Sequence, residues 1–147
     1  MGMQQILLIV LSVIIVGVAI AVGITMFRTQ AVNANRQALA NDLNTFAASA
    51  MAYYKTPESM GGGGRDFTSN ATYLYKWMGF EDDGTFSNDN GSYSLVKTAA
   101  TKDVLTIYGL GTEKADDTNY VGAKIELDMT DASPITFTIK DDLGTSL

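Results

Sequence analysis

The stretch ILLIVLSVIIVGVAIAVGITMF, residues 6–27, decides how the rest of the sequence has to be interpreted. Its 22 positions contain no charged side chain, and only Ser12, Thr25 and two glycines interrupt the run of aliphatic, methionine and phenylalanine residues. A helix of this length spans about 33 Å, which matches the roughly 30 Å hydrocarbon core of a bilayer. The sequence therefore predicts a helix that crosses a membrane or is buried in an assembly.

The charged residues all follow this stretch, since the 10 basic and 16 acidic side chains lie at or after Arg28. A secretory signal peptide would have a basic start, a shorter apolar run and a cleavage site of small residues. We therefore expect the apolar helix to be retained. The positive-inside rule, applied to Arg28 and Arg36 alone, would place the following domain in the cytoplasm, unless a basic leader has been removed.

The composition after Arg28 argues against several functions. The net charge of −6 disfavours nucleic acid as a partner, because a phosphate backbone attracts basic surfaces. The sequence has no Cys and no His, so disulfides, thiolate nucleophiles and imidazole bases are absent. With no serine nucleophile motif either, we expect no enzyme, no catalytic residues and no cofactor.

The predicted helix continues beyond the apolar stretch. Residues 29–56 contain no Gly or Pro, and Pro57 forbids further helix. The apolar residues of this segment recur at helical spacing, which is typical of an amphipathic helix. They are Val32, Leu39, Leu43, Phe46, Ala50 and Tyr54. The second half of the helix should therefore pack one face against a partner.

Residues 57–91 are predicted to be a glycine-rich linker followed by a loop region. Gly61–Gly64 precede Arg65 and Asp66, whereas a phosphate-binding loop would end in Lys-Ser or Lys-Thr, so we interpret the glycines as a flexible joint. A short helix or a tight loop should follow, with Ser69 or Asn70 as the N-cap and Gly79 as the stop. We expect this helix to pack Trp77 inward.

Residues 92–147 show the period of two that is typical of strands. Val121 to Met129 alternate apolar and polar side chains, and so do Ile135 to Ile139, while Tyr93 to Leu95 and Leu105 to Ile107 suggest two more strands. Short polar connections predict antiparallel pairing. The fold class is therefore α+β, a long helix packed on an antiparallel sheet of about four strands. The predicted helix–sheet core is Leu39, Leu43, Phe46, Ile125, Leu127, Phe137 and Ile139.

This organisation, together with QILLIV at residues 5–10, resembles the type IV pilins. Pilins have an apolar helix half, an amphipathic half, an intervening loop and an antiparallel sheet. A prepilin peptidase removes their leader, the new N-terminus is usually methylated, and a nearby glutamate stands in a run such as IELLIV. With Met1 as the mature start, Gln5 takes the place of that glutamate; with Met3 as the start, Leu7 would.

The resemblance implies a division into four segments: residues 1–28 as membrane and filament-core helix, 29–56 as amphipathic helix, 57–91 as linker and loop, and 92–147 as sheet. Met1 and Gln5 are the expected N-terminal docking residues, with the Gln5 amide accepting a hydrogen bond from a neighbouring subunit's amine. The helix-breaking proline of bacterial pilins is absent, so Gly17 and Gly23 are the candidates for local unwinding.

The function implied is that of a major subunit of an extracellular filament for adhesion, motility or surface colonisation. Identical subunits and the pilus assembly machinery would be the partners, and the membrane would hold the subunit before assembly. The expected filament-core residues are Ile6, Leu7, Leu8, Ile9, Leu11, Ile14, Ile15, Val18, Ile20 and Val22. The alternatives are a pseudopilin or minor pilin of a secretion or uptake system, and a single-pass membrane protein with an extracytoplasmic binding domain.

Two further kinds of site arise from short motifs. The acidic runs before Gly84 and Gly91 lack the ligand spacing of a calcium loop, so we predict no metal site there, although some pseudopilins bind calcium in their sheet region. Asn70 and Asn90 each begin an Asn-X-Ser/Thr triplet and are candidates for glycosylation.

Overall fold

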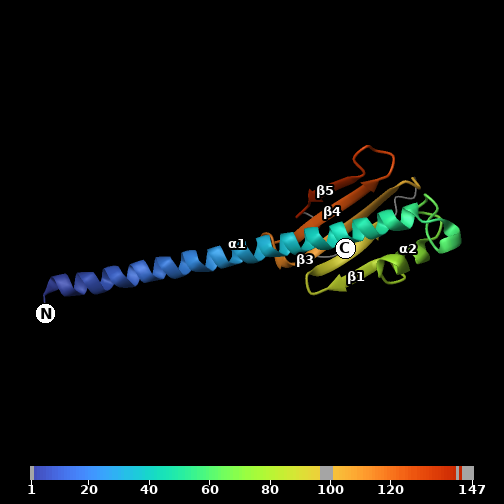
Figure 1. Cartoon of the computed structure of the whole chain (residues 1–147). Helices are drawn as coiled ribbons and strands as arrows, with labels where there is room; N and C mark the ends of the chain where they lie inside the picture. Colours follow the sequence, from blue (N-terminus) through green and yellow to red (C-terminus); the bar gives the residue numbers. More distant parts are fainter. Residues whose placement is uncertain (1, 97–100, 142, 144–147) are drawn as a thin grey trace.

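A single long helix carries the domain in the computed structural model (Figure 1). The structure describes residues 2–96, 101–141 and 143. Helix α1, Met3–Lys55, has 53 residues and is therefore about 80 Å long. Its first half projects away from the domain, and its second half lies against the sheet. The predicted α+β class and the two-part helix are confirmed.

Helix α1 runs without a break through both of its glycines. Gly17 and Gly23 are helical, and the hydrogen-bonded helix ends only after Lys55, where Thr56 turns to an extended conformation before Pro57. The predicted end of the helix is confirmed to within one residue. Both glycines are helical in the structure, so the two halves form one continuous helix.

The sheet contains five antiparallel strands in the order β1-β2-β3-β4-β5. They are β1 (Thr85–Asn88), β2 (Gly91–Val96), β3 (Val104–Lys114), β4 (Tyr120–Asp128) and β5 (Ile135–Ile139). The sequence predicted about four strands and missed β1. This strand has four residues and only one apolar side chain, Phe86, so its sequence shows no alternation of apolar and polar residues. It forms by pairing with β2, and that pairing cannot be read from the residues of β1 alone.

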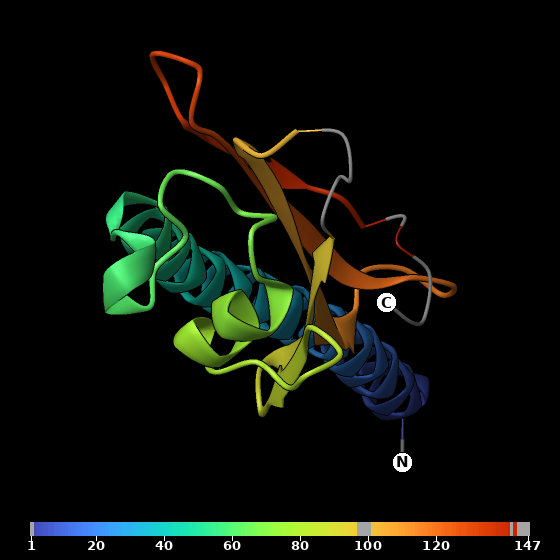
Figure 2. The same ribbon diagram turned by 90° about the vertical axis from the view of Figure 1, so that its right-hand side faces the viewer.

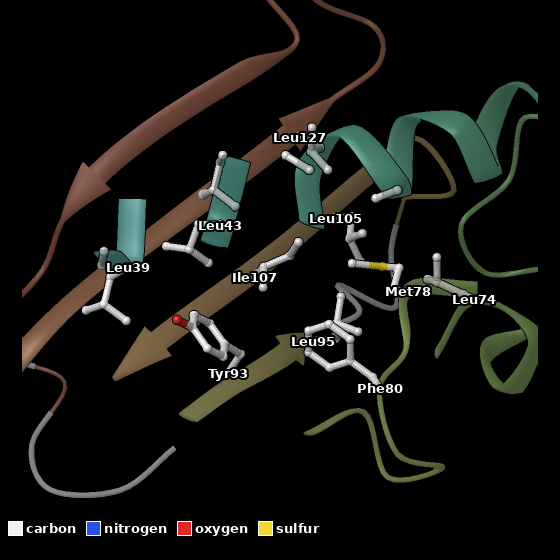
Figure 3. Packing of buried hydrophobic residues seen from close by; sticks show 14 of the residues in the cluster. Leu39, Leu43, Leu74, Met78, Phe80, Tyr93, Leu95, Leu105, Ile107 and Leu127 are labelled. Atoms are coloured by element: carbon white, nitrogen blue, oxygen red, sulfur yellow. The ribbon is translucent and has the colours of Figure 1, made fainter. Parts of the chain in front are cut away.

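The core lies between α1 and the central strands, as the view along the helix shows (Figure 2). Leu39 and Leu43 of α1 are fully buried, and so are Ile125 and Leu127 of β4, as predicted. Leu105 and Ile107 of β3 complete this layer (Figure 3).

Three of the predicted core residues behave differently. Phe46 is half-buried and packs edge-on against Phe80 and Tyr93, with ring centroids 4.8 and 5.1 Å apart. Phe137 and Ile139 remain 38% and 54% exposed, so their assignment to the core is wrong. The reason is that β5 is an edge strand, and α1 packs mainly against β3 and β4.

Helix α2, Ala71–Met78, packs beside the end of α1. Asn70 is its N-cap, accepting a hydrogen bond from the backbone of Tyr73, and Gly79 ends it in a left-handed conformation, as predicted. Leu74 and Met78 are buried, whereas Trp77 is 43% exposed. The prediction that Trp77 points inward is therefore wrong, because the narrow buried face of this short helix is filled by the two aliphatic side chains.

The glycine-rich segment closes the end of α1 instead of forming a flexible joint. Gly62 and Gly63 are buried, and the backbone amides of Gly63 and Arg65 donate to the carbonyls of Tyr53 and Tyr54. A Cβ atom at Gly63 would lie 2.6 Å from the Tyr53 ring. The segment approaches the helix end this closely because it lacks side chains, and it satisfies carbonyls that the helix leaves without partners. The short 3₁₀ helix η1, Glu58–Met60, lies within it.

Candidate assembly surface

The first half of α1 is an apolar surface that the domain leaves uncovered. All ten predicted filament-core residues lie on it, and each is between 50% and 70% exposed. Apolar side chains project on every side of the helix, since almost every position from Ile6 to Phe27 is apolar. We call residues 3–27 of α1 the bare half. It is long and apolar enough to cross a membrane.

The two hydroxyl groups of the bare half, on Ser12 and Thr25, are satisfied by the helix itself. The Ser12 hydroxyl donates to the carbonyl of Leu8 at 2.8 Å, and the Thr25 hydroxyl donates to that of Val22 at 2.8 Å. Neither hydroxyl therefore needs water, which is the condition for burial in lipid or in a packed assembly. The backbone amides and carbonyls of this helix are also hydrogen-bonded to one another, as burial in lipid requires.

The expected docking residues, Met1 and Gln5, lie at the start of the chain. Gln5 is exposed on the first turn of α1, and its backbone amide donates to the carbonyl of Gly2 at 3.0 Å. Met1 lies outside the described residues. Among the described residues, no side chain or backbone group is hydrogen-bonded to the Gln5 amide side chain, and the docking contact stays a prediction.

Charge begins abruptly where the domain begins. Arg28 pairs with Asp117 of the β3–β4 connection at 3.5 Å, in an exposed contact of little energy. Further along, Arg36 pairs with Asp141, whose carboxylate also accepts the backbone amide of Gly122. The boundary between the bare half and the charged domain therefore lies at one turn of a continuous helix.

On the second half of α1, the charges are held by the domain. Asp42 accepts hydrogen bonds from the Tyr93 hydroxyl at 2.5 Å and from the amides of Asn88 and Asn90 at 2.9 Å. Partial burial raises the pKa of Asp42, but these three donors outweigh it and hold the pKa below its ordinary value. Asn35, which the sequence analysis did not single out, is buried and donates to the carbonyl of Asn90. These contacts fix the β1–β2 hairpin to the helix.

The two glycosylation candidates differ in their surroundings. Asn70 is exposed, and its side-chain oxygen, not its nitrogen, takes part in the helix cap. Asn90 is half-buried, and its side-chain nitrogen donates to Asp42. Because glycosylation modifies that nitrogen, the folded domain offers Asn70 and shields Asn90.

The acidic runs are used in turns. Asp83 accepts from the backbone and hydroxyl of Thr85, which lowers its pKa, and Asp82 pairs with Lys76 in an exposed contact of 3.8 Å. Across the part of the chain that the structure describes, no three Asp or Glu side chains gather as a metal site would need.

Comparison with known proteins does not extend this description. No protein-family model, no curated protein and no solved structure matches the chain. The long apolar helix packed on an antiparallel sheet is compatible with a pilin-like fold, and it is the bare half that any functional interpretation has to explain.

Proposed function

We propose that this protein is the structural subunit of an extracellular filament of the type IV pilus kind, held in a membrane by its bare half before assembly. The observation that carries the proposal is that the bare half is apolar on all sides, uncovered, and continuous with the core of the domain. Full burial of one Leu or Ile side chain stabilises an assembly by about 1.5–3 kcal/mol. Residues 6–27 contain nine Leu and Ile side chains and five Val side chains.

The rigid connection favours a filament over a simple membrane anchor. An anchor needs only to hold its domain at the membrane, and a loose linker serves that purpose. Here the helix that would enter the membrane also supplies Leu39 and Leu43 to the domain core without a break. When such helices pack side by side, they fix every domain in a defined position around them, which is what a regular polymer requires. The proposed activity is assembly, with no chemistry on a substrate.

Electron microscopy of material sheared from cell surfaces tests the proposal directly. Fibres whose density follows this sequence, with residues 6–27 at their centre, would support it. A chain that stays in the membrane fraction, with no fibre containing it, would contradict it and favour a secretion pseudopilin or a single-pass membrane protein. Protease treatment of intact cells separates these outcomes further, because a domain that external protease cannot reach is not displayed on the cell surface and is incompatible with a surface filament.

A further inference from the structure

Among the described residues, a further apolar surface lies at the edge of the sheet. In the antiparallel register, Ile135, Phe137 and Ile139 of β5 stand opposite Leu127, Ile125 and Ala123 of β4. Directly opposed residues project from the same face, so the three β5 side chains point to the side on which α1 lies. Their β4 partners are buried, whereas they are 42%, 38% and 54% exposed.

From Arg36 to Met51, the flank of α1 that faces this strand is uncharged apart from Arg36, which is paired; Lys55 follows on the same side, four residues after Met51. Arg36 marks the flank because it pairs with Asp141, just after β5. Ala40, Asn44 and Met51 follow Arg36 by 4, 8 and 15 residues, which places them on the same side of the helix. Ala40 and Met51 are half-buried and Asn44 is exposed. We call these three residues, together with Ile135, Phe137 and Ile139, the inner shelf.

The inner shelf has the composition of a surface that another molecule covers. It combines branched and aromatic side chains with no charge, in a domain that carries all 26 charged residues of the chain. Charged residues are depleted at the centre of interfaces, and aromatic and methionine side chains are enriched there. The Arg36–Asp141 pair closes one end of the shelf without leaving a free charge on it.

We propose that the inner shelf is the docking site for the bare half of α1 from a second copy of this chain. Both surfaces are apolar and uncovered, so each supplies what the other lacks. The two surfaces are different, and a contact between different surfaces of identical chains repeats without closing unless the rotation completes a ring, which is the requirement for a helical polymer. This inference rests on the proposed filament function and adds the contact that places one subunit on the next.

The dimensions of the two surfaces agree. From Ile135 to Ile139 the strand extends about 14 Å, which corresponds to about nine residues of helix. The shelf therefore covers between two and three turns of the 25-residue bare half, leaving the rest for other copies. Because the shelf faces the same side as α1, a neighbouring bare half that runs alongside α1 reaches it without any rearrangement of the domain.

A photoreactive phenylalanine analogue, p-benzoylphenylalanine, placed at position 137 tests the contact in assembled filaments. Irradiation should produce covalent dimers in which position 137 is joined to a peptide from residues 3–27. The same analogue at Thr138 is the matched control, because Thr138 is exposed on the same strand but projects from the opposite face. It should give no adduct with residues 3–27.

Two substitutions test the same contact through filament yield, without the photoreactive side chain. Phe137→Asp should lower the yield of filaments at least tenfold, whereas Thr138→Asp should leave it unchanged. Both variant domains should still fold, with Phe137→Asp melting below the parent because only 38% of Phe137 is exposed. Filaments that form normally from Phe137→Asp, or adducts of position 137 with any segment other than 3–27, overturn the docking site while the filament function stands. If the parent chain forms no filament at all, the filament function fails, and the docking site fails with it.

Discussion

Replacing Ile15 with aspartate should abolish assembly while leaving the domain intact. Ile15 lies at the middle of the bare half, twelve residues from Met3 and twelve from Phe27, and is 59% exposed in the single chain. The nearest buried residue of the domain is Val32, about 25 Å further along the helix. A charge at position 15 therefore cannot reach the core of the domain, and its effect is confined to whatever covers the bare half.

The size of the effect follows from two terms. Assembly loses the burial of one isoleucine, about 1.5–3 kcal/mol, and each buried carboxylate without a partner costs several kcal/mol more. A combined loss of about 5 kcal/mol for each subunit raises the concentration of free subunit needed for assembly by more than a thousandfold. Filaments should therefore be absent from sheared material at any concentration reached in cells.

Filament yield by sedimentation and electron microscopy measures this effect, with the amount of chain in the membrane fraction as a reference. That reference matters because an aspartate at the centre of a membrane helix also disfavours insertion, by about 3 kcal/mol. Ser59→Asp adds the same charge at the exposed far end of the domain and should assemble normally. Abundant filaments from Ile15→Asp would show that the bare half is not buried between subunits, and the reasoning would be refuted.

Further predictions concern the domain itself. Gly111→Ala should lower the melting temperature of the domain by destabilising it about 1–3 kcal/mol, because the new Cβ would overlap the Asn35 side-chain oxygen; Gly17→Ala, which meets nothing within 4 Å, should not. Burial and the hydrogen bond to Asp103 raise the pKa of Tyr54 to about 12. Since an unfolded tyrosine ionises near pH 10, stability should fall between about pH 10 and 12 in alkaline melts, and Tyr54→Phe should reduce that fall. Peptide mapping of native material should place any N-linked glycan on Asn70; a glycan on Asn90 would contradict the shielding by Asp42.

The sequence predicts the helix and most of the sheet because their signals are local. An uninterrupted apolar run, a helical stripe and two alternating strands each follow from neighbouring residues, so Leu39, Leu43, Ile125 and Leu127 were assigned correctly to the core. The same alternation assigned Phe137 and Ile139 wrongly. A period of two shows that one face of a strand is apolar, but whether another element covers that face depends on the position of the strand in the sheet.

The other differences between the predictions and the structure also arise from contacts between residues far apart in the sequence. The flexible-joint interpretation of Gly61–Gly64 came from composition, whereas Gly62 and Gly63 are buried because the end of α1 needs partners for its carbonyls. Trp77 was expected inside because it is apolar, yet Leu74 and Met78 fill the buried side of α2. Asn35 gave no signal in the sequence, since its role depends on a hairpin 55 residues away.

The two uncovered surfaces together support the proposal that this chain assembles with other copies. The bare half cannot fold back onto the inner shelf of its own domain, because α1 is continuous through Gly17 and Gly23. Lipid can cover the bare half, but the shelf begins near Arg36, about 12 Å beyond the first charged residue, Arg28, and so lies outside the hydrocarbon. A polymer in which the bare half of one copy lies on the shelf of another covers both surfaces at once. A protein that remained in the membrane would keep Ile135, Phe137 and Ile139 in water, and the hydrophobic effect therefore acts in the direction of assembly.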